Sequence, residues 1–353
     1  MKSMKAAVLY GKKDIRIEKM ERPAAGPGEV VIQIKAVGIC GSDIHYYEEF
    51  RMGKTYEMTE PQILGHEPSG IIVEIGEGVK EIQVGDRVAV EPGETCGHCR
   101  HCKSGHYNLC RDVRFLSTPG NKGAFAEYLV MGADMVFKIP DQMSYEVASL
   151  SEPLSVGIHA CQLAEVQPGD RLMVLGGGPI GIMAVAAALA FGVTDITLGD
   201  IQENRLQFAR EHCHVSKTVN TGEMDAAQIV EHCTDGEGFD CVIETSGAPA
   251  ADYMSVDLVR KGGRISLVGI PKDEAVMFHI FDIIDKEVTL KGVFRYANSY
   301  PMAIQILEAG VIDFEAVITK QFALEDTAKA MEYALTQKSS SIKTVIVNKE
   351  EEH

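Results

Sequence analysis

The stretch VLGGGPIGIMA, residues 174–184, decides the fold of the middle part of this chain. Gly176, Gly178 and Gly181 match G-x-G-x-x-G; the apolar run DRLMVLG before them predicts a buried strand, and GIMAVAAALAFG predicts a helix. Gly176 permits the tight turn, Gly178 lets a pyrophosphate approach the backbone, and Gly181 lets helix and strand pack closely. Because the helix N-terminus offers free N–H groups to phosphates, the stretch predicts dinucleotide binding.

An acidic residue follows the glycine turn at the spacing this motif requires. Asp200 ends the predicted strand DITLGD, 19 residues after Gly181, where about 20 are expected. Its carboxylate can accept hydrogen bonds from both ribose hydroxyls of NAD, and it would repel the extra phosphate of NADP. Arg205 leaves NADP as an alternative cofactor, because a nearby arginine can bind a 2′-phosphate. A glycine turn with only a packing role would not need a strand before it, a helix after it and an acid at the end of the next strand. We therefore expect a dinucleotide to bind here and, because of Asp200, we expect it to be NAD.

The rest of the chain divides by its periodicity. Residues 1–140 hold short β-branched runs broken by Gly and Pro, such as GEVVIQIKAVGICG and VGDRVAVEP, which predict a mostly-β domain. Between about 160 and 290, strands alternate with helices such as ENRLQFAREHC, which predicts a doubly wound parallel sheet. We therefore predict an α/β protein with a first domain at 1–155, completed by 292–353, and a second domain at 156–291.

Composition narrows the class of protein. The 353 residues carry a formal net charge of −17, which argues against nucleic-acid binding, since that needs clustered Lys and Arg. No uncharged apolar run reaches the ~18 residues of a membrane span, and the first residues lack a signal-peptide core. We expect a cytoplasmic protein that binds neither nucleic acid nor membrane.

Four of the nine cysteines cluster in CGHCRHCKSGHYNLC, at Cys96, Cys99, Cys102 and Cys110. In a reducing cytosol such a cluster more often binds metal than forms disulfides. A redox pair needs a single C-x-x-C in a thioredoxin-like context, which this stretch lacks. An iron–sulfur cluster also takes four cysteines, but no proline follows the fourth one here. We prefer a structural zinc with four thiolates, which leaves no open position for a substrate.

A second metal site is suggested by Cys40 in GICGSDIH and by His66 and Glu67 in LGHEPSG. Sulfur, imidazole and carboxylate are good zinc donors, and three protein ligands leave one position open. From spacing alone this signal is weak, because a core cysteine beside a polar turn has the same pattern.

The order of these motifs resembles that of the zinc-dependent medium-chain alcohol dehydrogenases. GICGSDIH, GHE, the four-cysteine loop and the glycine turn follow one another as in that family, and the resemblance covers nearly the whole chain. The stretches GICGSDIHYY, SEPLSVGIHAC and LKGVFRYANSYP are similar to its sorbitol/xylitol (polyol) branch. The resemblance implies a GroES-like catalytic domain, a Rossmann coenzyme domain, NAD, a catalytic zinc and a homo-oligomer, with a tetramer favoured. Together with the zinc expected at the four-cysteine loop, we expect two zinc ions per chain.

The resemblance also assigns roles to individual residues. It implies catalytic zinc ligands at Cys40, His66 and Glu67, an acid near the metal at Glu152, and a proton relay through Ser42 and His45. The implied polyol contacts are Tyr46, Phe115, Thr118, Glu152, Arg295 and Tyr296. The expected cofactor contacts, besides the three glycines, Asp200 and Arg205, are Pro179, Ile180, Val268, Gly269, Ile270, Val293 and Phe294.

The expected reaction is oxidation of a secondary hydroxyl of a polyol to a ketose, with NAD as hydride acceptor. A threonine or sugar-alcohol-phosphate dehydrogenase is an alternative within the same family. A non-catalytic zinc scaffold or redox sensor is the alternative from another class, and the Cys40 trio and the complete glycine turn speak against it. The sequence does not choose among sorbitol, xylitol, iditol, arabinitol and ribitol.

Overall fold

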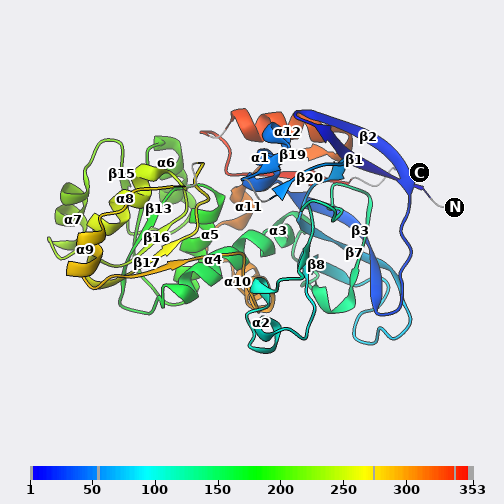
Figure 1. Ribbon diagram of the computed structural model, residues 1–353, viewed down its shortest axis with the longest axis horizontal. Coiled ribbons are helices and arrows are strands. Elements are labelled where there is room, and N and C mark those ends of the chain that lie inside the picture. The colour runs from blue at the N-terminus through cyan, green and yellow to red at the C-terminus, as the bar shows by residue number, and fades with distance from the viewer. Residues whose placement is uncertain (1–2, 54–55, 273–274, 338, 349–353) are drawn as a thin grey trace. The chain divides into compact units, whose positions relative to one another are not determined.

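The computed structural model describes residues 3–53, 56–272, 275–337 and 339–348, and the chain forms two compact units. Unit 1 consists of Met1–Glu152 and Val317–His353, and unit 2 of Pro153–Ala316 (Figure 1). The boundary expected at residue 291 therefore lies inside unit 2. The reason is that helix α10 (Tyr300–Ala309) packs against α5 (Pro179–Ala190) of the same unit. The chain returns to unit 1 only at Val317.

Unit 1 is built mainly from antiparallel strands. Its central sheet has the order β12-β8-β7-β3-β20-β19, with β11 also paired to β3, and a second sheet has the order β2-β1-β6. These strands are β1 (Ser3–Gly11), β2 (Asp14–Glu21), β3 (Glu29–Gly38), β6 (Gln62–Ile63), β7 (Glu67–Ile75), β8 (Arg87–Val90), β11 (Tyr128–Gly132), β12 (Val136–Lys138), β19 (Ile318–Ala323) and β20 (Lys343–Val347). The shorter pairs are β4 (Arg51–Met52) with β5 (Tyr56–Glu57) and β9 (Gly93–Glu94) with β10 (Arg114–Phe115).

Strand β3 organises unit 1, because it pairs with β7, β11 and β20. Its apolar residues are all buried, while Glu29, Gln33 and Lys35 are only half-buried. The helices of this unit are α1 (Gly41–Glu49), α2 (Arg100–Lys103), α3 (Tyr145–Ser149) and α12 (Thr327–Thr336). The pairing of β20 with β3 joins the C-terminal segment to the first part of the chain.

Unit 2 contains a six-stranded parallel sheet with the order β15-β14-β13-β16-β17-β18. Its strands are β13 (Arg171–Leu175), β14 (Asp195–Asp200), β15 (Lys217–Asn220), β16 (Phe239–Glu244), β17 (Val259–Leu267) and β18 (Thr289–Gly292). The order reverses between β13 and β16, which is the switch point where open α/β sheets bind their ligands. The predicted doubly wound parallel sheet is thus present.

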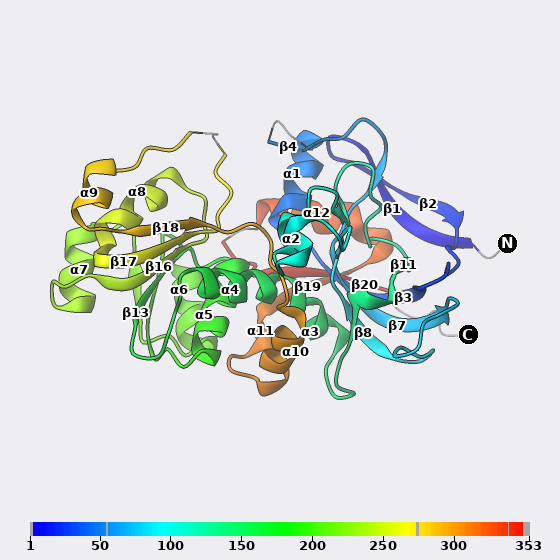
Figure 2. The ribbon, with the colours of Figure 1, turned by 60° about the horizontal axis from the view of Figure 1, so that its bottom comes forward.

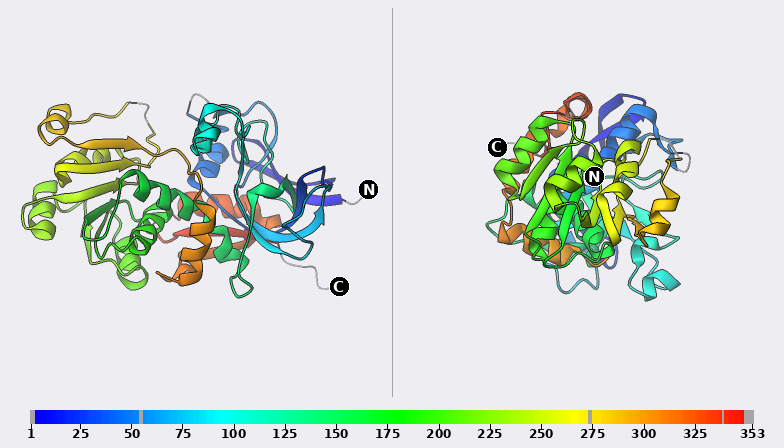
Figure 3. Two further views of the ribbon diagram at one scale, coloured as in Figure 1. Left: turned by 90° about the horizontal axis from the view of Figure 1, so that it is seen from below. Right: turned by 90° about the vertical axis from the view of Figure 1, so that its left-hand side faces the viewer.

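Helices cover both faces of this sheet, as the right-hand view of Figure 3 shows. They are α5, α6 (Glu203–His212), α7 (Ala226–Thr234), α8 (Pro249–Leu258) and α9 (Ile280–Asp285), with α4 (Ser151–Leu163), α10 and α11 (Phe314–Val317) besides. Because parallel crossovers are right-handed, α5 and α6 cover one face and α8 and α9 the other. Helix α5 is apolar all round and almost wholly buried, as its run of alanines and branched residues predicts. No helix in the described residues is long and apolar enough to span a membrane.

Candidate active site and cofactor site

Strands β3 and β7 bring the proposed catalytic ligands together. Cys40 follows β3 and caps the N-terminus of α1, while His66 and Glu67 stand at the start of β7. The antiparallel register places Glu67 opposite Gly38, two residues before Cys40. The sheet therefore joins two segments that are 26 residues apart in the sequence.

The three side chains can approach one ion. One ligand atom from each of Cys40, His66 and Glu67 lies within 4.8 Å of the other two. His66 is 5% exposed and Glu67 is completely buried, so a cation is the natural partner for these donors. A sulfur, a nitrogen and an oxygen donor suit zinc and leave a fourth position open. The residues therefore fit a catalytic zinc.

Asp43 orients His66, and the sequence reasoning did not find it. Its Oδ1 lies 3.5 Å from His66 Nδ1 and accepts hydrogen bonds from Gly65 N (3.2 Å) and Ser117 Oγ (3.3 Å), while Oδ2 accepts from Cys40 N (3.0 Å). A carboxylate at Nδ1 leaves Nε2 for a metal. The detectable signal was an acid three residues after Cys40, which is the spacing of a capping box at a helix N-terminus.

The charges in this cluster are strongly coupled. Burial opposes protonation of His66, but the negative charges of Asp43 and Cys40 outweigh it and raise the pKa of His66 well above its usual range. Burial disfavours the Asp43 carboxylate as well, yet His66 and the two backbone donors lower the pKa of Asp43. The aspartate therefore stays ionised and can hold the imidazole in place.

Lys343 is a second residue that the sequence reasoning missed. It begins β20, is 2% exposed, and its ammonium group donates to Glu67 Oε1 at 2.6 Å. Burial disfavours its charge, but Glu67 and Cys40 outweigh that effect and raise the pKa of Lys343. The signal was a lysine within the predicted closing strand IKTVIVN, which is otherwise uncharged.

The other residues predicted near the metal lie around α1 and α4. Glu152 is buried in the first turn of α4, and its charge acts on Lys343 and on Glu91. It is not part of the Cys40 group, whereas Glu67 is. Ser42 is half-buried and His45 exposed on α1, three residues apart and thus on neighbouring positions of one helix face.

Three predicted substrate contacts also lie in unit 1. Tyr46 is buried on α1, and the Phe115 ring centroid is 5.5 Å from that of His66. Thr118 Oγ1 donates to Phe115 O at 2.6 Å and accepts from Asn121 Nδ2 at 3.0 Å, which fixes the loop after β10. The structure thus brings Phe115 to the predicted metal ligands.

The remaining two, Arg295 and Tyr296, belong to unit 2. The Arg295 guanidinium carbon lies 4.8 Å from the centre of the Phe294 ring, and Tyr296 is buried against Tyr300 with ring centroids 5.8 Å apart. Arg295 has a φ of 54°, a left-handed conformation that non-glycine residues rarely adopt. Such strain at a polar residue is typical of functional segments.

The four clustered cysteines meet around α2. Cys99 Sγ and Cys96 Sγ lie 3.6 Å and 3.9 Å from Cys102 Sγ, and Cys110 completes a group within 4.8 Å. A tetrahedral ion with metal–sulfur bonds of about 2.3 Å separates its sulfurs by about 3.8 Å. An iron–sulfur cluster spreads its four cysteines over two or four irons, so at least some of the cysteine sulfurs lie further apart than around a single ion. These sulfurs therefore fit a single zinc ion.

Backbone donors prepare this loop for metal binding. N–H groups, chiefly that of Cys102, lower the pKa of Cys99 to about 6, which favours the thiolate that zinc needs. Burial instead raises the pKa of Cys110 to about 11. All nine cysteines are free, so the cluster contains no disulfide.

The glycine turn of unit 2 has the geometry predicted for it. Gly176 has a φ of 101°, and a Cβ at Gly181 would meet Gly176 O at 1.8 Å. Gly178 caps the N-terminus of α5, with Pro179 and Ile180 in its first turn. The turn therefore requires glycine at its first and last positions and presents N–H groups to an anion.

Asp200 stands at the end of β14, beside this turn. Its Oδ2 accepts from Gly177 N at 2.7 Å and from Arg205 Nη1 at 3.3 Å, and its Oδ1 accepts from Gln202 N at 2.8 Å. Three donors fix the carboxylate in orientation. Because Arg205 is ion-paired to Asp200, its charge is partly committed and less available to a 2′-phosphate.

The other predicted cofactor residues follow the carboxyl ends of neighbouring strands. Val268 and Gly269 follow β17 and donate to Glu244 O at 2.8 Å and 3.2 Å, and a Cβ at Gly269 would meet Gly247 N at 2.0 Å. Ile270 is 61% exposed. Val293 follows β18, donating to Leu267 O, with Phe294 after it. All of them lie at the sheet edge where such folds bind nucleotides.

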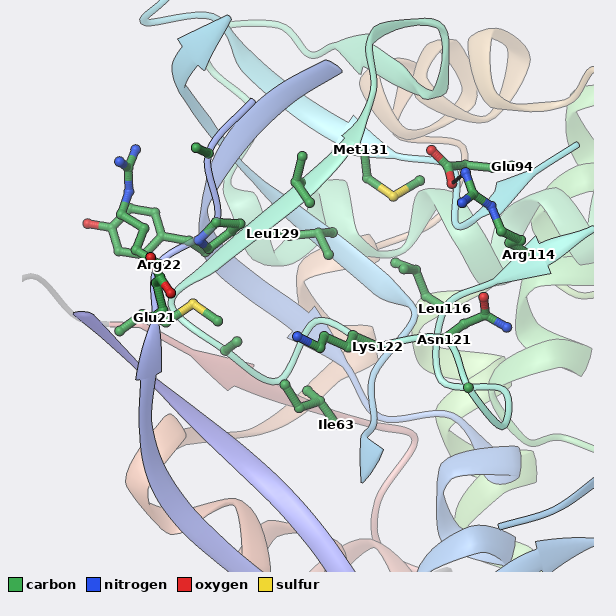
Figure 4. A pocket seen from close by; sticks show the side chains of 18 residues that line it. Glu21, Arg22, Ile63, Glu94, Arg114, Leu116, Asn121, Lys122, Leu129 and Met131 are labelled. Atoms are coloured by element: carbon green, nitrogen blue, oxygen red, sulfur yellow. Dashed lines mark hydrogen bonds and ion pairs between the residues drawn. The ribbon is translucent and has the colours of Figure 1, made fainter. Parts of the chain in front are cut away.

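A cavity of about 620 Å³ lies elsewhere in unit 1, against β1, β11 and the loop 120–123 (Figure 4). Its wall is apolar at Leu116, Leu129 and Met131, with Arg22 and Arg114 among the charged residues. None of the predicted metal ligands lines it, so it does not mark the site described above.

The two units together define a class of protein: a zinc- and nicotinamide-dependent dehydrogenase. Residues 26–141 match the family described as alcohol dehydrogenase GroES-like domain, and residues 179–309 match zinc-binding dehydrogenase. The chain therefore belongs to the zinc-dependent medium-chain alcohol dehydrogenases, and the relatives below place it in their polyol branch. The GroES-like and Rossmann folds expected from the sequence are confirmed.

Relatives match nearly the full length. The chain is 45% identical to sorbitol dehydrogenase of Bacillus subtilis (strain 168), over 98% of this chain and 97% of that protein. It is 39% identical to D-xylulose reductase of Saccharomyces cerevisiae, over 91% and 90%. Among solved structures, an Escherichia coli oxidoreductase/dehydrogenase of unknown specificity superposes with a TM-score of 0.94 at 35% identity, covering 99% of this chain and 100% of that one.

The sequence predicts a preference for NAD over NADP, and Asp200→Ala is expected to narrow it. The change would remove a charged acceptor for two ribose hydroxyls, each bond contributing about 1.5–3 kcal/mol, and it would free Arg205 for a 2′-phosphate. We expect kcat/KM for NAD to fall at least ~10-fold and that for NADP to rise. Glu203→Ala, which removes an exposed acid on α6, is the matched control. An unchanged ratio in Asp200→Ala would show that Asp200 does not read the ribose.

Proposed function

We propose that this protein oxidises a secondary hydroxyl group of a polyol of the sorbitol/xylitol type to a ketose, with NAD as the hydride acceptor. The observation that carries the proposal is the Cys40–His66–Glu67 group, buried at His66 and Glu67, in a chain that also has the glycine turn and Asp200. The similarity to a sorbitol dehydrogenase and a D-xylulose reductase supports a polyol as the substrate.

The residues of this chain divide the work as follows. Bound zinc would lower the pKa of a hydroxyl group and bound NAD would accept a hydride, which is the chemistry that these groups supply. Cys40, His66 and Glu67 would hold the metal, and Asp43 would fix the tautomer of His66. The turn at Gly176–Gly181 holds the pyrophosphate, and Asp200 binds the ribose.

The proton of the substrate hydroxyl group must pass from the buried metal site to solvent. Ser42 and His45 are the groups we propose for its transfer, since they lie on one helix next to Cys40 and become progressively more exposed. Glu152, buried near this group, is the acid we propose beside the metal. An imidazole can accept a proton on one ring nitrogen and release one from the other, so His45 can pass a proton on to solvent.

We propose two zinc ions per chain with separate tasks. Four thiolates on one ion leave no position for a substrate, so the Cys96–Cys110 loop has a structural role. The Cys40 group offers three ligands and an open position, so it has the catalytic role.

We also propose a homo-oligomer, with a tetramer favoured. Unit 2 exposes large apolar side chains beside the edge strand β18, on and just before α9 (Figure 2): Met277 (80%), Ile280 (62%), Phe281 (77%) and Ile284 (69%). A second copy that pairs along β18 would bury this surface and the unpaired strand edge. Light scattering measures the mass directly.

We expect the protein to act in the cytoplasm, where its nine free cysteines stay reduced.

Arg295→Ala tests the polyol assignment. A hydrogen bond from a charged donor to hydroxyls beyond the reacting carbon contributes ~1.5–3 kcal/mol, or roughly 10- to 100-fold in kcat/KM. We expect that loss with sorbitol or xylitol and a much smaller one with 2-propanol, which has no such hydroxyl. Lys291→Ala, on the neighbouring strand β18, should affect neither substrate.

The comparison of the two substrates cancels general damage to the metal site, since both need the same metal and hydride step. Equal losses for sorbitol and 2-propanol would mean that Arg295 supports the cofactor or the fold. The assignment of a polyol as the substrate would then lose the main support that an individual residue gives it.

A further inference from the structure

Glu67 has a second partner besides the proposed metal. Lys343 Nζ lies 2.6 Å from Glu67 Oε1 and 2.5 Å from Oε2, so one ammonium group contacts both carboxylate oxygens. The two side chains are 2% and 0% exposed. Buried ion pairs of this kind are rare, and their geometry must be good to offset the loss of hydration.

The fold makes room for this pair. A Cβ at Gly38 would lie 1.8 Å from Glu67 Oε2 and 2.8 Å from Lys343 Cε, so only glycine fits there. Gly38 on β3 pairs with Glu67 on β7 and with Val345 on β20. The lysine therefore comes from the C-terminal segment, where three strands of one sheet meet.

The charges show what the lysine does. Without a metal, the Glu67 carboxylate would be a buried anion close to Cys40, and an unpaired buried anion is strongly destabilising. Lys343 supplies the compensating positive charge. When a divalent cation binds the same carboxylate, the cation and the Lys343 ammonium group share one anion as their partner and repel each other.

We propose that Lys343 is a positioning residue that replaces the metal as the counter-ion of Glu67 and keeps the catalytic site formed while the metal is absent. The lysine stabilises the metal-free protein and, by the same contact, weakens metal binding at Cys40, His66 and Glu67. The proposal rests on the function given above, because it takes these three residues as the metal ligands.

The test measures zinc binding and metal-free stability in the whole protein. Zinc release to a chromogenic chelator should show two phases, and the phase that Cys40→Ser lacks belongs to the catalytic site. Lys343→Met should bind zinc at that site at least ~10-fold more tightly, because the competing charge is gone. After chelation its unfolding temperature should be roughly 5–10 °C below that of the equally treated wild type.

Three variants complete the design. Lys343→Arg keeps the charge and should restore wild-type zinc affinity and metal-free stability. The neutral pair Glu67→Gln/Lys343→Met should fold without metal but not bind zinc tightly. Lys320→Met, an exposed lysine on the adjacent strand β19 in register with Thr344, is the matched control and should change nothing.

The outcomes are distinct. Aggregation of chelated Lys343→Met, but not of the neutral pair, would also support the counter-ion role. Unchanged or weaker zinc binding in Lys343→Met, with normal metal-free stability, would overturn it. A wild-type protein with no release phase dependent on Cys40 would instead overturn the metal site on which the proposal rests.

Discussion

Cys40→Ser is expected to reduce kcat for sorbitol or xylitol by about 10³-fold or more while the fold stays intact. The change replaces the only thiolate of the catalytic group by a hydroxyl, a poor zinc ligand. Lewis-acid stabilisation by a bound metal is worth several kcal/mol, and each 1.4 kcal/mol is tenfold in rate. Turnover with NAD, zinc content and the circular dichroism spectrum are the measurements.

The variant should keep one zinc per chain, held by the four-cysteine loop. Cys233→Ser is the control, because it removes a thiol from the core of unit 2, far in the sequence from any proposed ligand. It should lower stability somewhat and leave the turnover of folded molecules unchanged. Substantial activity in Cys40→Ser would remove this residue from the catalytic site.

Cys96→Ser is expected to have the opposite profile, with a large loss of stability and little loss of specific activity in the molecules that remain folded. Three thiolates make an incomplete tetrahedral site, and the binding free energy of a structural zinc is part of the folding free energy. We expect one zinc fewer per chain and an unfolding temperature lower by roughly 5–15 °C.

His101→Ala is the matched control for this loop, because His101 is exposed next to Cys102 and we assign it no ligand role. It should keep both zinc ions and the wild-type unfolding temperature. Loss of turnover in Cys96→Ser at normal stability would contradict the division between a structural and a catalytic site.

Local sequence patterns predicted those parts of the site that lie on one short segment. The glycine turn, its helix and Asp200 follow from the geometry of a single strand–turn–helix–strand unit. The four cysteines span 15 residues, so one loop can gather them. The Cys40 group could not be predicted in this way, because its two segments are joined only by the register of a sheet. The spacing of its residues was a weak signal for a metal site, and the family resemblance was the stronger one.

Contacts between distant segments could not be predicted in this way. Lys343 meets Glu67 across 276 positions, and nothing in IKTVIVN says which buried anion its lysine will find. The expected boundary at residue 291 and the division of the structure at Val317 differ because of helix α10. Its sequence has the amphipathic pattern of any packed helix, and this pattern does not tell that it packs against α5.

The most direct test of the central claim is NADH formation, followed by absorbance, when the purified zinc-loaded protein receives NAD and one substrate at a time. The panel should contain sorbitol, xylitol, iditol, arabinitol and ribitol beside L-threonine and a sugar-alcohol phosphate. The account predicts NADH with at least one free polyol, at a kcat/KM well above that for threonine or the phosphate. NADH formation with threonine or the phosphate alone, or with no substrate at all, would contradict it.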